Sequence, residues 1–170
     1  MNLRMLDPVQ DVDLLPQLSQ MAVEAADDGV PVHFADCISD NDPENYWREI
    51  SQGMAGGKLA VLGALEGGKL LGSLSLCLNT PPNQAHCTRL RSMLVRSAMQ
   101  RRGIGSALLA VAEAEARNRE RWLMLAETVS GSPAAKLFTR AGWEKVGDVP
   151  AMVTLPHGGL APGTIYFKRL

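Results

Sequence analysis

A loop rich in arginine and glycine reads QRRGIG over residues 100–105, just before a strongly helical segment. Glycine lets the backbone come close to a ligand, and the free N–H groups at a helix start attract an anion because the helix dipole lies behind them. Arg101 and Arg102 add side-chain donors suited to phosphate. The run predicts an anion-binding loop. Composition alone leaves a plain turn with solvated arginines as an equal alternative.

Two better-known phosphate motifs are missing from the sequence. No segment reads G-x-x-x-x-G-K-[ST], the loop that cradles nucleoside triphosphates. A dinucleotide fingerprint needs G-x-G-x-x-G, and Leu108 occupies the position of its third glycine. The 100–105 loop is therefore not predicted to bind phosphate in either of those two ways.

The loop connects two elements that would hold it in place. Residues 86–95 predict a long strand, and residues 104–119 predict the clearest helix, because their apolar residues recur at helical spacing. Earlier in the chain, residues 59–65 and 70–78 are apolar runs joined by a Gly-Gly turn, which is typical of a hairpin. The anion-binding loop is thus expected between a sheet strand and a helix.

The remaining elements follow from shorter signals. Helices are expected over 11–26, from Asp42-Pro43-Glu44 toward Gly53, and from Ser132 to Gly142; strands are expected over 3–6, 122–126, 143–146 and 164–169. Residues 149–163 are rich in proline and glycine and are expected to form a loop. Because helices and strands alternate only in the second half, the order predicts an α/β (α+β) class with a mixed sheet.

Composition limits the class of protein. The 170 residues carry 17 basic and 18 acidic side chains, a net charge of -1, so no bulk field draws the chain to nucleic acid or anionic lipid. No apolar run could span a bilayer, and Cys37, Cys77 and Cys87 lack metal-ligand spacing. We expect one domain over 1–170 in the reducing cytoplasm, with no metal, nucleic-acid or membrane partner.

The 100–105 run resembles the Q/R-x-x-G-x-G/A motif of the GNAT acetyltransferases, the GCN5-related N-acetyltransferase superfamily. Residues 134–143 resemble the family's A-x-x-L-Y-x-x-x-G-F segment, and residues 146–150 and 163–168 are similar to its tabtoxin-resistance acetyltransferase branch. The resemblance covers most of the chain. It implies the GNAT fold, a twisted, mostly antiparallel mixed sheet of about six to seven strands, splayed in the middle and flanked by about four helices.

The resemblance also implies acetyl-CoA as co-substrate. In the family, the strand before the loop pairs with the pantetheine arm as an added strand would, and the loop amides hold the pyrophosphate. An amide of that strand can also polarise the thioester carbonyl. The residues that the resemblance assigns to acetyl-CoA are Met93, Leu94, Val95, Gln100, Arg101, Arg102, Gly103, Ile104, Gly105 and Ser106.

Glu127 is the expected general base for the incoming amine. It follows the 122–126 strand, beside the splayed gap, and the tabtoxin-resistance branch has a carboxylate at the matching position. The alternative is that Glu127 caps the helix beginning near Ser130 or interacts with its dipole. Phe138 stands where the family has the tyrosine that protonates the CoA thiolate, so that proton needs another donor. The candidates are water, Ser130, Ser132 and Tyr166.

Arg89 and Arg91 alternate with apolar or small residues and therefore share one face of the 86–95 strand. Arg89 also replaces a second carboxylate of the tabtoxin-resistance pattern, and an arginine cannot act as a base near neutral pH. We expect both arginines to line the acceptor pocket and to recognise a carboxylate on an amino acid or a small peptide-like compound. Arginines extending into solvent are an equal alternative.

The sequence predicts an N-acetyltransferase that moves an acetyl group from acetyl-CoA to the primary amine of a small molecule in a ternary complex. The long 149–163 loop favours a closed acceptor pocket over the open groove of a protein or peptide acetyltransferase. A non-catalytic acyl-CoA-binding domain is the third hypothesis, kept open by Phe138 and Arg89. A homodimer is one possible assembly because homodimers are common among such folds.

Overall fold

The computed structural model describes residues 1–32 and 43–170 and places a seven-stranded sheet at the centre of this part of the chain. The helices are α1 (Leu15–Asp27), α2 (Pro43–Ala55), α3 (Ile104–Asn118) and α4 (Pro133–Arg140). The strands are β1 (Asn2–Met5), β2 (Leu59–Glu66), β3 (Lys69–Cys77), β4 (Cys87–Val95), β5 (Leu123–Val129), β6 (Glu144–Thr154) and β7 (Leu160–Arg169). Their order in the sheet is β1-β2-β3-β4-β5-β7-β6.

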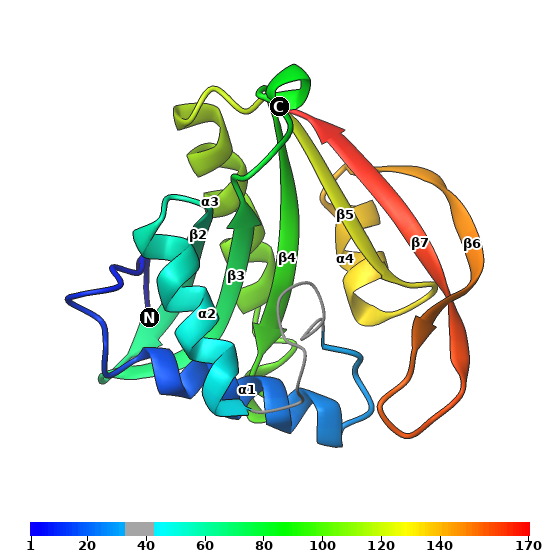
Figure 1. Cartoon of the computed structure of the whole chain (residues 1–170). Coiled ribbons are helices and arrows are strands. Elements are labelled where there is room, and N and C mark those ends of the chain that lie inside the picture. Colours follow the sequence, from blue (N-terminus) through cyan, green and yellow to red (C-terminus); the bar gives the residue numbers. More distant parts are fainter. Residues whose placement is uncertain (33–42) are drawn as a thin grey trace.

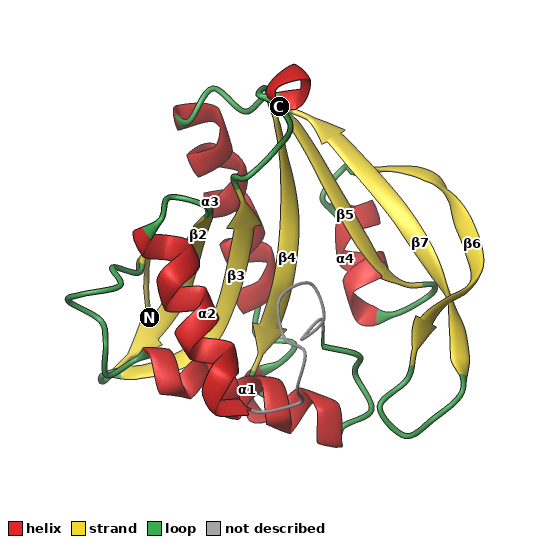
Figure 2. Cartoon of the chain, viewed as in Figure 1, coloured by secondary structure: helices red, strands yellow, loops and turns green. Residues whose placement is uncertain are grey.

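Helices cover both faces of the sheet, with α1 and α2 on one face and α3 and α4 on the other (Figures 1 and 2). Strand β2 is buried on both sides: Leu62 belongs to the core under α3 with Leu108, and Val61 belongs to the core under α1 with Leu18. Because successive strand residues point to opposite faces, one unbroken apolar run supplies both cores. Among the helices that the structure describes, none is long and apolar enough to cross a membrane.

The sheet parts between β4 and β5. These two strands are parallel and pair at three positions, Cys87↔Leu123, Thr88↔Met124 and Arg89↔Leu125. Beyond Arg89 their ribbons diverge (Figure 1), while the other neighbouring strands pair in antiparallel fashion. The expected fold, a mostly antiparallel mixed sheet splayed in the middle and flanked by four helices, is therefore confirmed for the described residues.

One buried carboxylate joins the two parts of the sheet on the α3–α4 side. Glu113 of α3 accepts hydrogen bonds from Lys168 Nζ of β7 at 2.8 Å and from Trp143 Nε1 at 2.9 Å. Lys168 also donates to the carbonyl of Ala141, just after α4, at 2.7 Å. A buried acid needs such partners, because leaving it unpaired would cost its full desolvation. The cluster fixes α3, which packs on β2 and β3, against the β7 side.

The first helix begins later than its apolar pattern predicts. Residues 8–14 form turns, and α1 starts at Leu15 rather than at Asp11. The Asp11 carboxylate is engaged elsewhere: it accepts from the Asp7 backbone N–H at 2.8 Å and from both terminal nitrogens of Arg4 at 2.6 Å. This pairing with β1 and the preceding turn outweighs the helical pattern. Asp42, expected to cap the second helix, lies outside the described residues.

The prediction that residues 149–163 form a loop is wrong. Strand β6 continues to Thr154 and β7 begins at Leu160, so residues 155–159 are the turn of a hairpin. The register of β6 on β7 slips between Val149 and Val153, and Pro150 lies in this irregular stretch. Because β6 is also an edge strand, the missing N–H of a proline there breaks no ladder in the sheet's interior.

We predict that the Arg4–Asp11 pair makes the protein sensitive to acid. The hydrogen bonds from Arg4 hold the pKa of Asp11 below its ordinary value. The stabilisation is therefore complete above the unfolded-state pKa, about 3.9, and is lost as the pH falls through the lower folded-state pKa. Asp11→Asn should lower the free energy of unfolding at pH 7 by about 2 kcal/mol.

Urea unfolding of wild type and Asp11→Asn between pH 7 and pH 2 measures this effect. The difference in unfolding free energy between the two proteins should shrink as the pH falls below about 4. The loss begins there because the ordinary pKa of aspartate, which applies to the unfolded state, is about 3.9. Asp13→Asn, at an exposed position two residues away, is the matched control and should change stability little. A wild-type advantage that stays constant down to pH 2 would contradict the prediction.

Candidate functional site

The 100–105 loop joins the end of β4 to the start of α3. A 3-10 turn at Ser97–Met99 leads into it, and Gln100 Nε2 donates to the carbonyl of Val95 at 3.2 Å, which ties the loop back to the strand. Gly103 is the N-cap of α3 and adopts the left-handed conformation, with a φ of 81°. Arg101 is also left-handed, with a φ of 59°. Glycine is favoured at the cap because this conformation strains residues that have a side chain.

The first turn of α3 presents backbone donors at the mouth of this loop. Gly103 has no side chain to cap the helix, so the amides of Ile104, Gly105 and Ser106 meet no side-chain acceptor from the cap residue. Arg101 and Arg102 are exposed beside them. Such an arrangement can hold a phosphate or diphosphate group. The structure thus brings together the loop residues that the sequence predicts for the cofactor.

Gly105 serves packing rather than conformation. A Cβ atom at this position would lie 3.3 Å from Leu137 Cδ2 of α4. The glycine therefore lets α3 and α4 approach closely just where the loop ends. Ser106, next to it, borders a hollow of about 300 Å³ between the same two helices, which Glu113 and Lys168 line at its far end.

Strand β4 offers backbone groups to the gap. Its ladder with β5 ends at Arg89 in the described sheet, so the 90–95 stretch turns its β5-side edge to the open gap. The strand also bulges there: Ser73 pairs with Leu94 but Ser75 pairs with Arg91, and Ser92 has a φ of 38°. A bulge re-aims the backbone. Met93, Leu94 and Val95 lie directly after it, on the edge that an extended ligand could pair with.

Tyr46 of α2 contacts the bulge of β4 from the face of the sheet that α1 and α2 cover (Figure 1). Its side chain is buried, with 5% of its surface exposed, and its hydroxyl shares a hydrogen bond with Ser92. Burial raises the pKa of Tyr46, so the phenol stays protonated over the physiological range. The sequence pattern does not mark this residue, because a tyrosine at helical spacing is typical of core packing.

Glu127 lies inside β5, where it pairs with Ile165 of β7, and not after the end of the strand as expected. It does not cap α4: Ser132 is the N-cap, and its hydroxyl accepts from the Ala135 N–H at 3.1 Å. Instead, Arg89 Nη1 of β4 lies 3.4 Å from Glu127 Oε1. Both side chains are partly exposed, at 45% for Arg89 and 36% for Glu127. The structure brings these two predicted site residues together where β4 and β5 part.

Arg91 lies two residues beyond Arg89 and opposite Ser75 of β3. It is half-buried and does not simply extend into solvent. The two arginines therefore follow one another along the strand that borders the gap, as the sequence predicts.

The candidate donors of the thiolate proton, and Phe138 at the position of the family's tyrosine, each have different surroundings. Phe138 is fully buried and packs on Trp143 and Tyr166, with ring centroids 5.0 and 5.5 Å away. The Ser130 hydroxyl bonds to Thr164 at 2.7 Å, and the Ser132 hydroxyl caps α4. Both serine hydroxyls thus hold local structure. Tyr166 is buried with 6% of its surface exposed, between Phe138 and a hollow behind α4.

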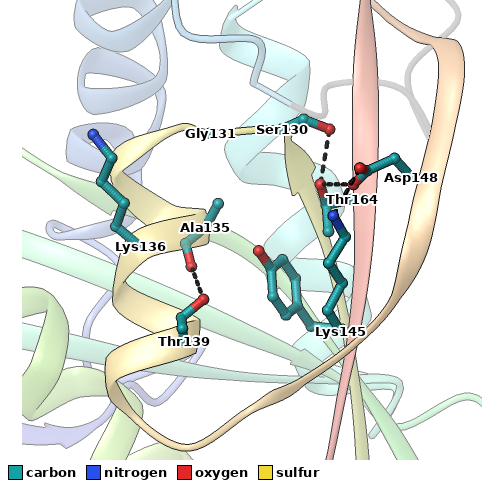
Figure 3. A pocket seen from close by; sticks show the side chains of 9 residues that line it. Ser130, Gly131, Ala135, Lys136, Thr139, Lys145, Asp148 and Thr164 are labelled. Atoms are coloured by element: carbon teal, nitrogen blue, oxygen red, sulfur yellow. Dashed lines mark hydrogen bonds and ion pairs between the residues drawn. The ribbon is translucent and has the colours of Figure 1, made fainter.

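That hollow, of about 280 Å³, is a polar site that the sequence analysis did not single out. Lys145 Nζ and the Thr164 hydroxyl converge on Asp148 at 2.7 and 2.6 Å, whereas Lys136 points away from them (Figure 3). The hydrogen bonds from Lys145 and Thr164 hold the pKa of Asp148 below its ordinary value. Its polar groups satisfy one another, and apart from Ser130 and Tyr166 no residue predicted for chemistry lines the hollow.

No metal centre is present in the described part of the chain, where no group of three His, Cys, Asp or Glu side chains converges. His86 stacks on Trp122, with ring centroids 4.4 Å apart, and His157 Nε2 lies 3.2 Å from the Asp27 carbonyl. His33 and Cys37 lie outside the described residues.

Comparison with known proteins identifies what this arrangement is similar to. The model of the acetyltransferase (GNAT) family matches residues 32–143. The match includes β4, the glycine–arginine loop, α3, β5 and α4. It therefore covers both the gap and the loop at its edge.

Solved structures share the whole fold at low identity. A ribosomal-protein-alanine N-acetyltransferase from Brucella melitensis is 24% identical over 100% of both chains, with a TM-score of 0.78. The yncA protein of Salmonella typhimurium, solved with its cofactor acetyl-CoA, is 20% identical over 100% of this chain and 94% of its own, with a TM-score of 0.76. An aminoglycoside 6'-acetyltransferase type Ii is 18% identical over 99% and 97%, with a TM-score of 0.72.

We predict that Gly103→Ala destabilises the protein although nothing crowds the site. No atom lies within 4 Å of an added Cβ, so the cost comes from the left-handed backbone alone and should be about 1–2 kcal/mol. Gly147→Ala is the matched control, because its surroundings are equally open and its φ is not positive. Chemical unfolding of both variants measures the difference. Equal stability of the two variants would contradict the prediction.

Proposed function

The chain belongs to the acetyltransferase (GNAT) family, and from that premise we propose that it transfers an acetyl group from acetyl-CoA to the primary amine of a small molecule. One observation carries the proposal: the unpaired edge of β4 leads straight into a loop whose amides and arginines suit a diphosphate. Acetyl-CoA has both parts that such a site needs, an extended amide-bearing arm and a diphosphate. A metal has no role in this proposal.

Each predicted cofactor residue has a part in this binding mode. The backbone of Met93, Leu94 and Val95 would pair with the amides of the pantetheine arm. The amides of residues 103–106 would bind the diphosphate, and Arg101 and Arg102 would neutralise its charge. Gln100 would hold the loop in place through its bond to Val95.

The proposed reaction is a direct transfer within a ternary complex. The nitrogen of the neutral amine attacks the acetyl carbonyl, the carbon–sulfur bond breaks, and CoA leaves as a thiolate. A backbone amide of the bulged β4 stretch would stabilise the negative charge on the carbonyl oxygen. Glu127 takes the proton that the ammonium form of the acceptor must lose, directly or through water. Phe138 has no proton to give, and the Ser130 and Ser132 hydroxyls are engaged in local hydrogen bonds. We propose that the second proton, which the attacking nitrogen loses as the amide forms, reaches the thiolate through water.

Arg89 and Arg91 are proposed to recognise a carboxylate on the acceptor. The contact of Arg89 with Glu127 supports this assignment, because it places a cation and an anion side by side at the gap. An acceptor with an amine and a nearby carboxylate would match both charges. A guanidinium has five N–H donors, so one contact to Glu127 leaves others for a substrate oxygen. Amino acids and small peptide-like compounds are the acceptor class.

The proposal extends to the tabtoxin-resistance branch on the resemblance of residues 146–150 and 163–168. Strand β6 contains the first of these segments and β7 the second. We propose a cytoplasmic location, because a reducing compartment suits the free thiols of Cys77 and Cys87. No nucleic-acid or membrane partner is proposed.

A peptide acceptor is the second candidate function. The preference for a closed pocket depended on a long covering loop over 149–163, and that segment forms a hairpin with a short turn. Because residues 149–163 do not form a long loop, the argument against an open groove no longer holds. Turnover of free amino acids against short peptides of the same N-terminal residue separates the two functions, because only the second needs bound residues beyond the first.

Thermal unfolding with acetyl-CoA tests the cofactor proposal. A ligand that binds only the folded state increases the free energy of unfolding and therefore raises the unfolding midpoint. The increase is about 2.7 kcal/mol when the ligand concentration is 100 times the dissociation constant. We expect a clear rise for wild type and a much smaller one for Arg101→Ala and Gly103→Ala, each measured against its own unliganded midpoint. No rise at millimolar acetyl-CoA would overturn the proposal. A rise without turnover of any amine would support the non-catalytic alternative.

Kinetics of Glu127→Gln and Arg89→Ala test the acceptor side. Glu127→Gln should lower kcat by about 10²–10⁴-fold, because the ammonium proton loses its acceptor, and should leave the KM for acetyl-CoA nearly unchanged. Arg89→Ala should raise KM for acceptors that carry a carboxylate and spare neutral amines. An equal effect of Arg89→Ala on both acceptor classes would refute the carboxylate role, and full activity of Glu127→Gln would refute the base.

A further inference from the structure

The C-terminal end of α1 is acidic, which the helix dipole disfavours. Glu24, Asp27 and Asp28 lie in or just after its last turn, and no basic residue accompanies them on the helix. A helix C-terminus carries partial negative charge and is stabilised by cations. These acids therefore conflict with their own helix, and a local conflict of this kind marks a position where tertiary contacts or function decide the residue.

The compensating cation comes from the segment that follows β4. Arg96 Nη1 forms an ion pair with Glu24 Oε1, and Arg96 Nε donates to the carbonyl of Leu70 at 2.7 Å. The Arg96 side chain is 22% exposed, so it is well buried for an arginine. The next residue, Ser97, donates its hydroxyl to Asp28 Oδ2. Two consecutive residues are thus held by two acids four positions apart, which share one face of α1.

Arg96 and Ser97 directly precede the glycine–arginine loop. The Ser97–Met99 turn runs into Gln100, and the loop then reaches the N-cap Gly103. In Figure 1, α1 crosses beside the end of β4, on the face of the sheet opposite to α3. The contacts therefore fasten the start of the loop to a helix on the other side of the sheet. Its far end is fastened by α3 itself.

We propose that Arg96 is a positioning residue for the anion-binding loop and not a ligand of the diphosphate. Glu24 of α1 holds Arg96 in place, and Asp28, the C-cap of α1, holds the neighbouring Ser97. The inference rests on the proposed function, since it names how that cofactor loop is positioned. It divides the arginines by role: Arg101 and Arg102 are exposed in the loop and are assigned to the anion, whereas Arg96 already has a carboxylate and a carbonyl as partners.

The rival interpretation predicts the opposite sign for one substitution. If Arg96 were a third diphosphate ligand, Glu24 would compete with the diphosphate for it. Glu24→Ala would then free the arginine, remove a negative charge near an anion site, and tighten binding of CoA. If Glu24 positions the loop, Glu24→Ala weakens binding in spite of that charge. Alanine is the best helix former, so this exposed substitution does not disturb α1 itself.

Binding of CoA, measured by calorimetry, gives the first readout. We expect Glu24→Ala and Arg96→Ala each to raise the dissociation constant about fivefold, which corresponds to about 1 kcal/mol. The double variant should bind no more weakly than Arg96→Ala alone, because both changes break the same contact. Arg96→Lys keeps the charge but cannot make both Arg96 contacts, so it should bind like Arg96→Ala. Tighter or unchanged binding by Glu24→Ala would overturn the proposal.

Glu115→Ala is the matched control. It removes a carboxylate that is paired with Arg119 at the far end of α3, away from the loop. Its dissociation constant for CoA should stay within about twofold of wild type, because a surface ion pair contributes little.

Hydrogen exchange of the protein without ligand gives a second readout that does not depend on the cofactor. Glu24→Ala should speed exchange over residues 97–105 and leave the strands of the sheet unchanged, because only the loop loses its attachment. Unchanged exchange over 97–105 would overturn the proposal. If wild type failed to bind CoA at all, the proposed function would fall, and the exchange experiment would still decide whether α1 holds the loop.

Discussion

The parting of two parallel strands is the constraint on which the rest of this structure depends. Backbone N–H and C=O groups need partners, and a sheet normally supplies them all along each strand. Here β4 and β5 share three paired positions and then separate. The free edge, the bulge at Ser92, the loop after Val95 and the Arg89–Glu127 contact all gather at this opening. The residues proposed for catalysis and binding thus gather where the sheet leaves its own hydrogen bonding incomplete.

Much of the framework could be predicted because its signals are local. Gly67 and Gly68 both adopt positive φ and close the β2–β3 hairpin, as a Gly-Gly pair predicts. The apolar spacing of residues 104–119 predicts a helix from residue 104, and α3 begins there and ends at Asn118. The proposed cofactor loop belongs to this class, since residue types and spacing within a few positions define it. The splayed sheet came from family resemblance, and the observed pairing confirms it.

What could not be predicted depends on contacts between separate elements of the fold, most of which join residues far apart in the chain. Asp11 reads as part of a helix until Arg4 engages it, and Pro150 reads as a loop until the edge position of β6 makes it tolerable. The contact between Arg89 and Glu127 needs two strands to be parallel and in register. The attachment of Arg96 to Glu24 joins residues 72 positions apart. Patterns within a window of sequence carry no information on such pairs.

The Glu113 cluster has a mechanical consequence. The gap divides the molecule into two half-sheets, β1–β4 and β5–β7, which share only a short ladder. Behind them, Glu113 belongs to the helix packed on the first half, and Lys168 and Trp143 belong to the second. The hydrogen bonds of this carboxylate therefore link the two halves of the sheet to each other. The width of the opening is thus set by the helical layer behind it as well as by the strands at its edges.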